Sequence, residues 1–497
     1  MNLEAILKKY YQLSAFRGGQ KETIESILNK RHTLAMLPTG TGKSLCYQLA
    51  GKLLEGTVII ISPLLSLMQD QVEQMKMKGE KRVVALNSFL NPTEKNKVLR
   101  QIKQYKYIFI SPEMISFPHI IDQLQKMEIS LFVIDEAHCI SQWGYDFRPD
   151  YQKLGEIRQK LNNPLTLALT ATATEAVRED IIKSLHLEMV EEIIYSVDRA
   201  NIAINIEEVS HVQEKVDKLL EYIQRLDGQG IVYFSSKKLA EQTVAFLKEK
   251  SSKRIMAYHG GMTQEDRILV QQQFLAGQLD VICATSAFGM GINKEDIRFI
   301  IHYHLPTQLE SYLQEIGRAG RDGNPSVSII LYTPGDEWIA YQLIESELAD
   351  ELQINQWKAR LKNFPSFEAW QKKEGYQLEM LFTETQWRVL ESYIEPNNKT
   401  VSELLHSLKL YNDFRENRVN EKRRKVQDLM EWLHSISCRR RYILEYFGEK
   451  YESKENENCC DRCGIELSNF YHKKSMEDDE VLVDWKSQLA FILNIKK

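Results

Sequence analysis

HTLAMLPTGTGKS, residues 32–44, is the stretch of this 497-residue chain that best predicts its fold. It joins a short apolar run to a glycine-rich turn that ends in Lys43 and Ser44. Glycines let backbone N–H groups approach phosphate oxygens, and the N-terminus of a following helix adds partial positive charge. The stretch therefore predicts a strand, a phosphate-binding turn and a helix, in that order.

The turn has a predicted role for each of its polar groups. Lys43 would reach the β- and γ-phosphates of a nucleotide, and the Ser44 hydroxyl would bind Mg²⁺. Leu37 stands where the generic pattern has its first glycine, so this is a variant of the motif, and a glycine-rich turn with an unrelated lysine is the alternative. The predicted nucleotide-binding residues of the turn are Pro38, Thr39, Gly40, Thr41, Gly42, Lys43 and Ser44.

Apolar, β-rich runs recur on both sides of a break near Asp198–Glu208, and helix-length segments separate them. This pattern indicates parallel sheets covered on both faces, so we predict an α/β protein with two tandem lobes. The first series of predicted strands is His32–Leu37, Thr57–Ser62, Lys106–Ser111, Leu131–Asp135 and Thr166–Thr170. The second series is Gly230–Phe234, Arg254–Tyr258, Asp280–Ala284, Phe299–Tyr303 and Val327–Tyr332.

Composition excludes several classes of protein. With 43% hydrophobic and 27% charged residues the chain is neither disordered nor collagen-like. No apolar run approaches the roughly 20 residues that span a bilayer, and the N-terminus has no signal-peptide pattern, so we expect a cytoplasmic protein. A net charge of −5 excludes a uniformly basic nucleic-acid coat, although a local basic groove is compatible with it.

Asp135-Glu136-Ala137-His138 follows the fourth predicted strand, where a carboxylate belongs beside a phosphate-binding turn. We predict that Asp135 is the carboxylate that serves the Mg²⁺ ion. Glu136 is predicted to orient or deprotonate the attacking water. Two acidic residues after a strand are also typical of a solvated turn. Together with Lys43 and Ser44 they predict a nucleoside triphosphatase.

Arg318 and Arg321 lie in QEIGRAGRDG, residues 314–323 of the second lobe. An arginine delivered across a domain cleft stabilises charge on the transferred phosphate and contributes about 10³–10⁵ in rate. We therefore predict that both arginines are catalytic. The alternative is a surface ion-pair cluster with Glu315 and Asp322.

These segments, in this order, resemble those of superfamily-two helicases and, more specifically, of RecQ-type DNA helicases. The similarity runs from Phe16 to Gly323 and resumes around Cys438. It implies two RecA-like lobes, ATP as the nucleotide, and a nucleotide site that includes Arg17 and Gln20, with Gln20 reading the adenine. It also implies 3′→5′ movement on single-stranded DNA in recombination and repair.

Segments 62–71, 111–113 and 170–173 resemble those that contact the translocating strand and link that contact to hydrolysis. Residues 140–151, ISQWGYDFRPDY, resemble the aromatic-rich loop of RecQ proteins, which RNA helicases of the DEAD type lack. Aromatic faces and arginine planes stack on unpaired bases for about 1–3 kcal/mol per base. The alternative is that the aromatic residues are simply core. The predicted DNA-coupling residues are His138, Gln142, Trp143, Phe147 and Arg148.

Four of the seven cysteines cluster near the C-terminus and predict a structural Zn²⁺ site. The cluster resembles the RecQ zinc module, except that Cys459 adjoins Cys460 where a common form has its cysteine at the position of Glu457. A site completed by another side chain, or a module without zinc, is the alternative. The module is expected to present Arg439–Arg441 to DNA phosphates, unless they form a solvated helix face. The predicted ligands are Cys438, Cys459, Cys460 and Cys463.

The predicted domains are the first lobe (1–200), the second lobe (201–345), a helical insertion (346–430), the zinc module (431–470) and a tail (471–497). A helix-turn-helix over 387–410 would add DNA contacts, although a scaffold is favoured for the insertion. The 34 residues after Cys463 are too few for the winged-helix and further domains of typical RecQ proteins, so we expect a short, RecS-type bacterial form.

We therefore expect an ATP-dependent DNA helicase that acts as a nucleoid-associated monomer and uses ATP, Mg²⁺ and structural Zn²⁺. The acidic tail would either dock a protein partner or fray. A nucleotide-gated DNA-binding or annealing module that does not unwind DNA is the alternative function, and an RNA helicase is a less favoured one.

Overall fold

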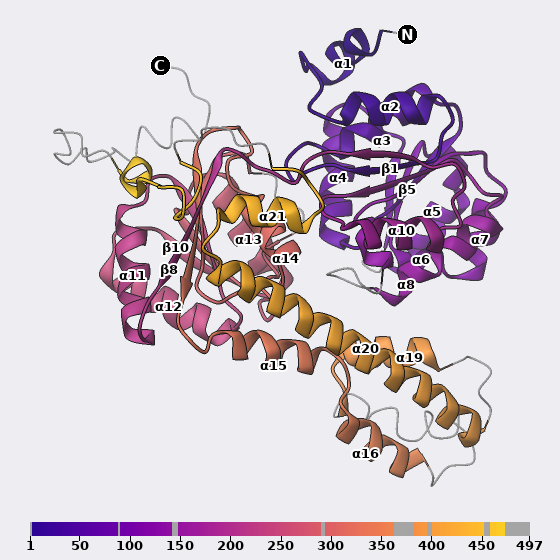
Figure 1. The fold of residues 1–497 in the computed structure, drawn as a ribbon. Coiled ribbons are helices and arrows are strands. Elements are labelled where there is room, and N and C mark those ends of the chain that lie inside the picture. Colours follow the sequence, from indigo (N-terminus) through magenta and orange to yellow (C-terminus); the bar gives the residue numbers. More distant parts are fainter. Residues whose placement is uncertain are drawn as a thin grey trace.

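The computed structural model describes residues 2–87, 90–141, 148–289, 294–361, 381–394, 400–451 and 458–472. Within these residues the chain forms two parallel-sheet lobes that lie side by side, a helical arm that extends from them, and a small cysteine-containing module (Figure 1). None of the described helices has both the length and the apolar character needed to cross a membrane.

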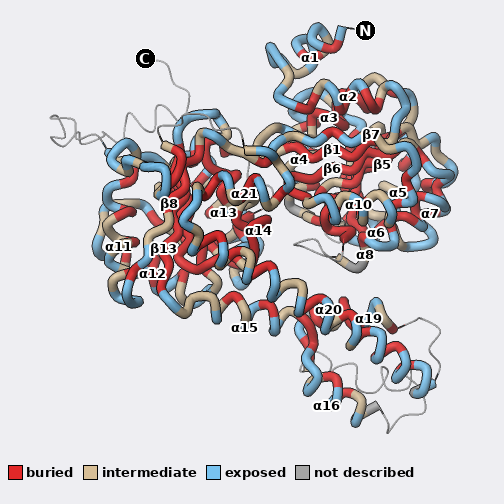
Figure 2. Tube along the Cα trace, viewed as in Figure 1, coloured by how far each residue is buried: buried red, intermediate tan, exposed pale blue. Residues whose placement is uncertain are grey.

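Lobe 1 contains a seven-stranded sheet in the order β3-β4-β2-β5-β6-β1-β7, and every pairing in it is parallel. Its central strands are buried on both faces, as continuous apolar runs predict (Figure 2). The strands are β1 (Thr33–Met36), β2 (Thr57–Ile61), β3 (Val83–Leu86), β4 (Tyr107–Ile110), β5 (Ile129–Ile134), β6 (Thr166–Thr170) and β7 (Glu191–Ile194).

Helices and short 3₁₀ turns cover both faces of this sheet. They are α1 (Leu3–Tyr11), α2 (Gln20–Leu28), α3 (Ser44–Leu53), α4 (Leu65–Met77), α5 (Pro92–Arg100), η1 (Ile102–Gln104), α6 (Pro112–Ile115), α7 (Pro118–Leu124), η2 (Ala137–Ile140), α8 (Pro149–Gln152), α9 (Leu154–Lys160) and α10 (Glu175–Ser184). The edge strands β3 and β7 were not predicted. β7 is only partly buried and begins with two glutamates, so it lacks the apolar run that marks a central strand.

Lobe 2 contains a six-stranded parallel sheet in the order β10-β11-β9-β12-β13-β8. Its strands are β8 (Ile202–Glu208), β9 (Gln229–Tyr233), β10 (Ile255–Tyr258), β11 (Val281–Ala284), β12 (Ile297–His302) and β13 (Ser326–Tyr332). Its helices are α11 (Val212–Arg225), α12 (Lys237–Lys250), α13 (Gln264–Leu275) and α14 (Leu309–Ile316). The predicted break at residues 198–208 is therefore mostly strand β8, and only its first residues link the lobes.

The arm and the cysteine module follow lobe 2. Their elements are α15 (Glu337–Glu347), α16 (Glu351–Leu361), α19 (Glu384–Tyr393), α20 (Val401–His434), α21 (Arg439–Tyr446) and η4 (Leu467–Phe470). The outer arm has a small core of its own around Trp357, Leu390 and Tyr411. Helix α20 runs without a break through residue 430, so the predicted boundary between insertion and zinc module falls inside a helix.

Candidate active site

The phosphate-binding turn lies between β1 and α3, as its sequence predicted. Gly40 and Gly42 have φ angles of 89° and 76°, in the left-handed region that only glycine adopts easily. The Thr41 hydroxyl donates a hydrogen bond of 2.8 Å to the Pro38 carbonyl, which closes the turn. Lys43 Nζ lies 3.4 Å from the Leu37 carbonyl oxygen. The turn is therefore shaped in advance for a phosphate group.

Arg17 and Gln20 brace the backbone of this turn. Gln20 Nε2 donates to the Thr41 carbonyl at 2.7 Å and to the Gly42 carbonyl at 3.1 Å, while its Oε1 accepts from the Arg17 backbone N–H at 2.8 Å. The Arg17 guanidinium donates to the Gly40 carbonyl. The family resemblance implied adenine recognition by Gln20, which stays a prediction. The contacts within the chain give both residues a second role, which is to hold the turn.

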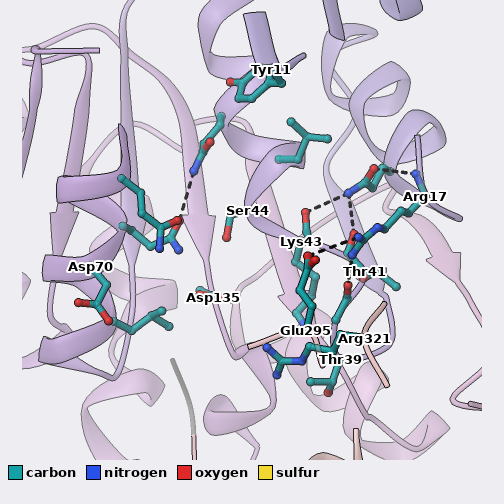
Figure 3. A pocket seen from close by; sticks show the side chains of 18 of the residues that line it. Tyr11, Arg17, Thr39, Thr41, Lys43, Ser44, Asp70, Asp135, Glu295 and Arg321 are labelled. Carbon is teal, nitrogen blue, oxygen red and sulfur yellow. Dashed lines mark hydrogen bonds and ion pairs between the residues drawn. The ribbon is translucent and has the colours of Figure 1, made fainter. Parts of the chain in front are cut away.

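A cleft of about 400 Å³ brings the predicted residues of both lobes together (Figure 3). The phosphate-binding turn and the two acidic residues come from lobe 1, and both arginines come from lobe 2. The predicted residues that line it are Arg17, Gln20, Thr39, Gly40, Thr41, Gly42, Lys43, Ser44, Asp135, Glu136, Arg318 and Arg321. Pro38 belongs to the turn but not to this lining.

Asp135 and Glu136 lie at the carboxyl end of β5, on the floor of the cleft. Burial and the adjacent Glu136 carboxylate raise the pKa of Asp135 to about 7, although Lys43 opposes the shift. Glu136 is buried with φ 50° and ψ 49°, a conformation that costs a non-glycine residue about 1–3 kcal/mol and that clusters at active sites. Its buried Oε2 accepts no hydrogen bond from the described residues. These carboxylates fit Mg²⁺ and water as partners, and a solvated turn is excluded.

His138 and Arg148 connect this floor to the segments predicted to contact DNA. The buried His138 Nδ1 lies 3.0 Å from the Thr170 hydroxyl and 3.5 Å from Glu136 Oε2. Arg148 Nη1 donates to the Pro63 carbonyl at 2.9 Å. The other predicted coupling residues, Gln142, Trp143 and Phe147, lie outside the described residues.

Arg318 and Arg321 both line the cleft, and Arg321 lies beside Gly40 of the phosphate-binding turn, so they do not form a surface cluster. Arg318 is 3% exposed and donates to the Gly289 carbonyl. Burial, with repulsion from Arg318 and Arg199, lowers the pKa of Arg321 to about 9. The two carboxylates that the alternative required have other partners. His302 lies 2.8 Å from Glu315, and Arg298 pairs with Asp322 at 2.7 Å.

Residues that were not predicted to belong to the nucleotide site also line the cleft or reach it. Asp70 and Glu295 line the cleft, and Glu295 lies 3.8 Å from Arg17 across the two lobes. Arg199, in the linker between the lobes, donates to carbonyl groups of both lobes. Its partners are about 120–160 positions away, so no local pattern marks it.

The four predicted zinc ligands converge on one point. Their sulfur atoms all lie within 4.8 Å of one another, with Cys438 Sγ 3.6 Å from Cys459 Sγ and 3.9 Å from Cys460 Sγ. Zn–S bonds of about 2.3 Å in a tetrahedron place the sulfurs about 3.8 Å apart. The residues present therefore fit Zn²⁺. Cys459 belongs to the cluster despite its unusual position beside Cys460.

The prediction that the arginines of α21 are presented to DNA phosphates is wrong for two of the three. Arg439 is 1% exposed and pairs with Asp461 at 2.9 Å. Arg440 is 6% exposed and pairs with Asp198. Only Arg441 is exposed, where it pairs with Glu445 at 2.9 Å. Two of the three side chains are therefore internal braces, and a fully solvated helix face is excluded as well.

Comparison with known proteins shows the family to which the chain belongs. The DEAD/DEAH box helicase family matches residues 17–180, the helicase conserved C-terminal domain matches 214–323, and the RecQ zinc-binding family matches 399–464. The chain is 44% identical over 495 residues to the probable ATP-dependent DNA helicase RecS of Bacillus subtilis, covering 99% of this chain and 98% of that protein. The chain belongs to the RecQ-type superfamily-two helicases.

More distant relatives agree with this membership of the RecQ-type helicases. The ATP-dependent DNA helicase RecQ of Bacillus subtilis is 39% identical over 70% of this chain and 59% of its own length. The structure of Mycobacterium smegmatis helicase Lhr bound to single-stranded DNA and AMP-PNP superposes with a TM-score of 0.54 at 19% identity, over 68% of this chain and 49% of that one. That likeness concerns the fold alone.

Family membership also identifies the bound groups of this RecQ-type chain as ATP, Mg²⁺ and structural Zn²⁺. Lys43 and the turn's N–H groups would hold the phosphates, with Ser44 and Asp135 on the Mg²⁺ side. The RecQ zinc-binding match begins at residue 399, next to the start of α20. The family match therefore covers both α20, whose first half packs in the core of the outer arm, and the cysteine module.

Proposed function

We propose that this protein is an ATP-dependent DNA helicase that moves 3′→5′ along single-stranded DNA and separates duplexes during recombination and repair in the bacterial cytoplasm. The observation that carries the proposal is one cleft in which the phosphate-binding turn and acidic pair of lobe 1 face two arginines of lobe 2. The full-length similarity to a DNA helicase, RecS, adds the choice of DNA.

The geometry indicates how hydrolysis would depend on the two lobes. Mg²⁺ supplies positive charge beside the terminal phosphates when ATP is bound. Glu136 orients the attacking water and accepts its proton, since its buried Oε2 accepts no hydrogen bond from the described residues. Arg318 and Arg321 stabilise the developing negative charge only while lobe 2 lies against the turn. Turnover therefore requires the cleft to close.

Strand occupancy would reach this cleft through two short contacts. Arg148 holds the backbone at Pro63, where the first predicted strand-contacting segment begins. His138 lies between Thr170 and Glu136, so movement of the 170–173 segment bears directly on the residue that orients water. Each ATP cycle would move one lobe relative to the other and offset the roughly 1.4 kcal/mol of stacking in a base-pair step.

The helical arm is our proposed element for duplex separation. Arg388 of α19 lies 3.6 Å from Glu113, which belongs to the second predicted strand-contacting segment. The arm therefore reaches the face of lobe 1 along which the strand is proposed to run. A rigid body at that place can block the complementary strand while the other one passes.

The test is strand displacement on partial duplexes with a single-stranded tail at either the 3′ or the 5′ end of the loading strand. We expect displacement only from the 3′-tailed substrate, with ATP present. Lys43→Ala should abolish ATPase and displacement while DNA binding persists, and Arg321→Ala should keep ATP binding but stop turnover. ATP hydrolysis without displacement of any substrate would instead support a nucleotide-gated binding or annealing module.

A further inference from the structure

Arg199 lies in the linker between β7 and β8, and its side chain joins the two halves of the cleft. Nη1 donates to the Thr39 carbonyl at 3.0 Å and to the Gly317 carbonyl at 3.1 Å. Nη2 donates to the carbonyls of residues 319 and 320, at 2.9 Å and 2.7 Å. One guanidinium therefore spans from the phosphate-binding turn of lobe 1 to the 317–320 segment of lobe 2.

The 317–320 segment carries Arg318 and immediately precedes Arg321. The two surfaces that Arg199 joins are in close contact, because a Cβ added at Gly317 would lie 2.9 Å from Thr39 Cβ, and one added at Gly40 would lie 2.9 Å from Arg321 Cγ. At such separations, a small change in the linker moves both catalytic arginines relative to the turn.

The zinc module holds the linker from the opposite side. Arg440 of α21 donates to the Asp198 carboxylate, to the Arg199 carbonyl at 3.1 Å and to the Ile202 carbonyl at 2.7 Å. Farther along, the β8 residue Ile204 donates its backbone N–H to the carbonyl of zinc ligand Cys459 at 3.2 Å. A continuous set of contacts therefore runs from the cysteine cluster to the ATP cleft.

We propose that Arg199 is a positioning residue that sets the distance between the phosphate-binding turn and the two catalytic arginines, and that Arg440 of the zinc module holds it in place through Asp198. This inference rests on the proposed function, because it assigns a role in the same ATP cycle. It makes the zinc module part of the machinery that closes the cleft, in addition to its part in the fold.

The proposal separates nucleotide binding from turnover. Gln20, Arg17 and Thr41 brace the phosphate-binding turn from within lobe 1, independently of Arg199. Loss of the Arg199 guanidinium should therefore leave ATP affinity nearly intact. It should nevertheless reduce kcat, since the arginines of lobe 2 are no longer held against the turn.

The experiment compares Arg199→Ala with the parent protein in steady-state ATPase assays and in titrations with ADP and with ADP plus aluminium fluoride, a mimic of the transferring phosphate. Loss of hydrogen bonds made by a charged group predicts at least about a tenfold fall in kcat, with KM for ATP within about threefold. ADP affinity should stay close to that of the parent, whereas affinity for ADP–aluminium fluoride should fall. Arg199→Lys should restore only part of kcat, because one ammonium cannot reproduce the planar fork.

Arg254→Ala is the matched control. Arg254 also makes several hydrogen bonds, to Asp280 and to the Gly277 carbonyl, but on an exposed part of lobe 2 outside the cleft. It should leave the kinetics of ATP hydrolysis unchanged. A general loss of folding would appear as a lower melting temperature and a parallel loss of ADP binding.

A double-mutant cycle tests the connection to the zinc module without disturbing α21. Asp198→Asn should reduce kcat several-fold in the parent but add little in the Arg199→Ala background, with zinc content unchanged in both. Full additivity, unchanged kcat in Arg199→Ala, or equal losses of ADP and transition-state-mimic affinity would overturn the inference. All values are ratios to the parent, so they remain decisive even if the parent proves insensitive to DNA and the proposed function fails.

Discussion

At the scale of single residues, local motifs predicted the site well and long-range contacts stayed hidden. Lys43, Ser44, Asp135 and Glu136 are each marked by neighbours in sequence, and the structure brings them into one cleft. Arg199 has no such mark, because its acceptors come from both lobes. The exposure of Arg440 was predicted wrongly for the same reason, since its partner Asp198 lies 242 positions away.

Gly40→Ala tests the close approach of the lobes. The substitution would put a methyl group 2.9 Å from Arg321 Cγ at a φ of 89°, so we expect loss of most ATPase activity. Gly277→Ala is the control, because its φ of 74° imposes similar backbone strain while nothing lies within 4 Å of the new Cβ. It should cost about 1–2 kcal/mol of stability at most and keep ATPase activity. Equal activity of the two variants would argue against the closed arrangement of the cleft.

At the scale of helices and strands, prediction found every central strand and missed three of the four edge strands, β3, β7 and β8, while the edge strand β10 was predicted. Two of the missed strands are partly polar, since β8 ends in two glutamates and β7 begins with two. The third, β3, is a run of only four apolar residues. Helix α20 was fragmented in the prediction because its middle is strongly charged. The structure shows the reason for that charge, since Lys422 and Arg423 pair with Glu347 and Glu345 of α15.

These ion pairs define where the arm can be removed. Glu347 lies 3.8 Å from Arg418, so residues 350–416 can be replaced by a short Gly-Ser linker that leaves the paired part of α15 and α20 in place. We expect this deletion to reduce duplex displacement at least about tenfold while single-strand-stimulated ATPase stays within about threefold of the parent. The two activities are measured on the same preparation. A parallel loss of both would show that the arm serves the fold or the motor and not strand separation.

At the scale of the whole molecule, the zinc module and α20 together brace lobe 2 and the linker between the lobes. Cys459 and Asp461 form backbone hydrogen bonds with Ile204 at the edge of the lobe 2 sheet. Arg440 donates to the Arg199 carbonyl of the linker, and Lys425 of α20 pairs with Glu310 of lobe 2. The sequence predicted the four ligands from their clustering. It did not predict this bracing, because the partners are far apart in sequence, 241 positions for Arg440 and Arg199 and 115 for Lys425 and Glu310.

Removal of zinc should therefore lower the stability of the whole protein and not only of the zinc module. We expect one zinc per chain, and a lower melting temperature after chelation, because structural zinc binding is coupled to folding. Cys459→Ser should lower zinc content, which tests directly whether a cysteine adjacent to another ligand is itself a ligand. Cys283→Ala, a substitution at a buried cysteine in lobe 2 outside the cluster, should keep one zinc. Full zinc content in Cys459→Ser would remove this residue from the site.

A bound DNA strand is expected to promote closure of the two lobes around ATP. The most direct measurement is the initial rate of ATP hydrolysis with and without a single-stranded DNA oligonucleotide, beside an RNA oligonucleotide of the same sequence. We predict a rate that rises at least about tenfold with DNA and much less with RNA. A rate that does not respond to either strand would contradict the account.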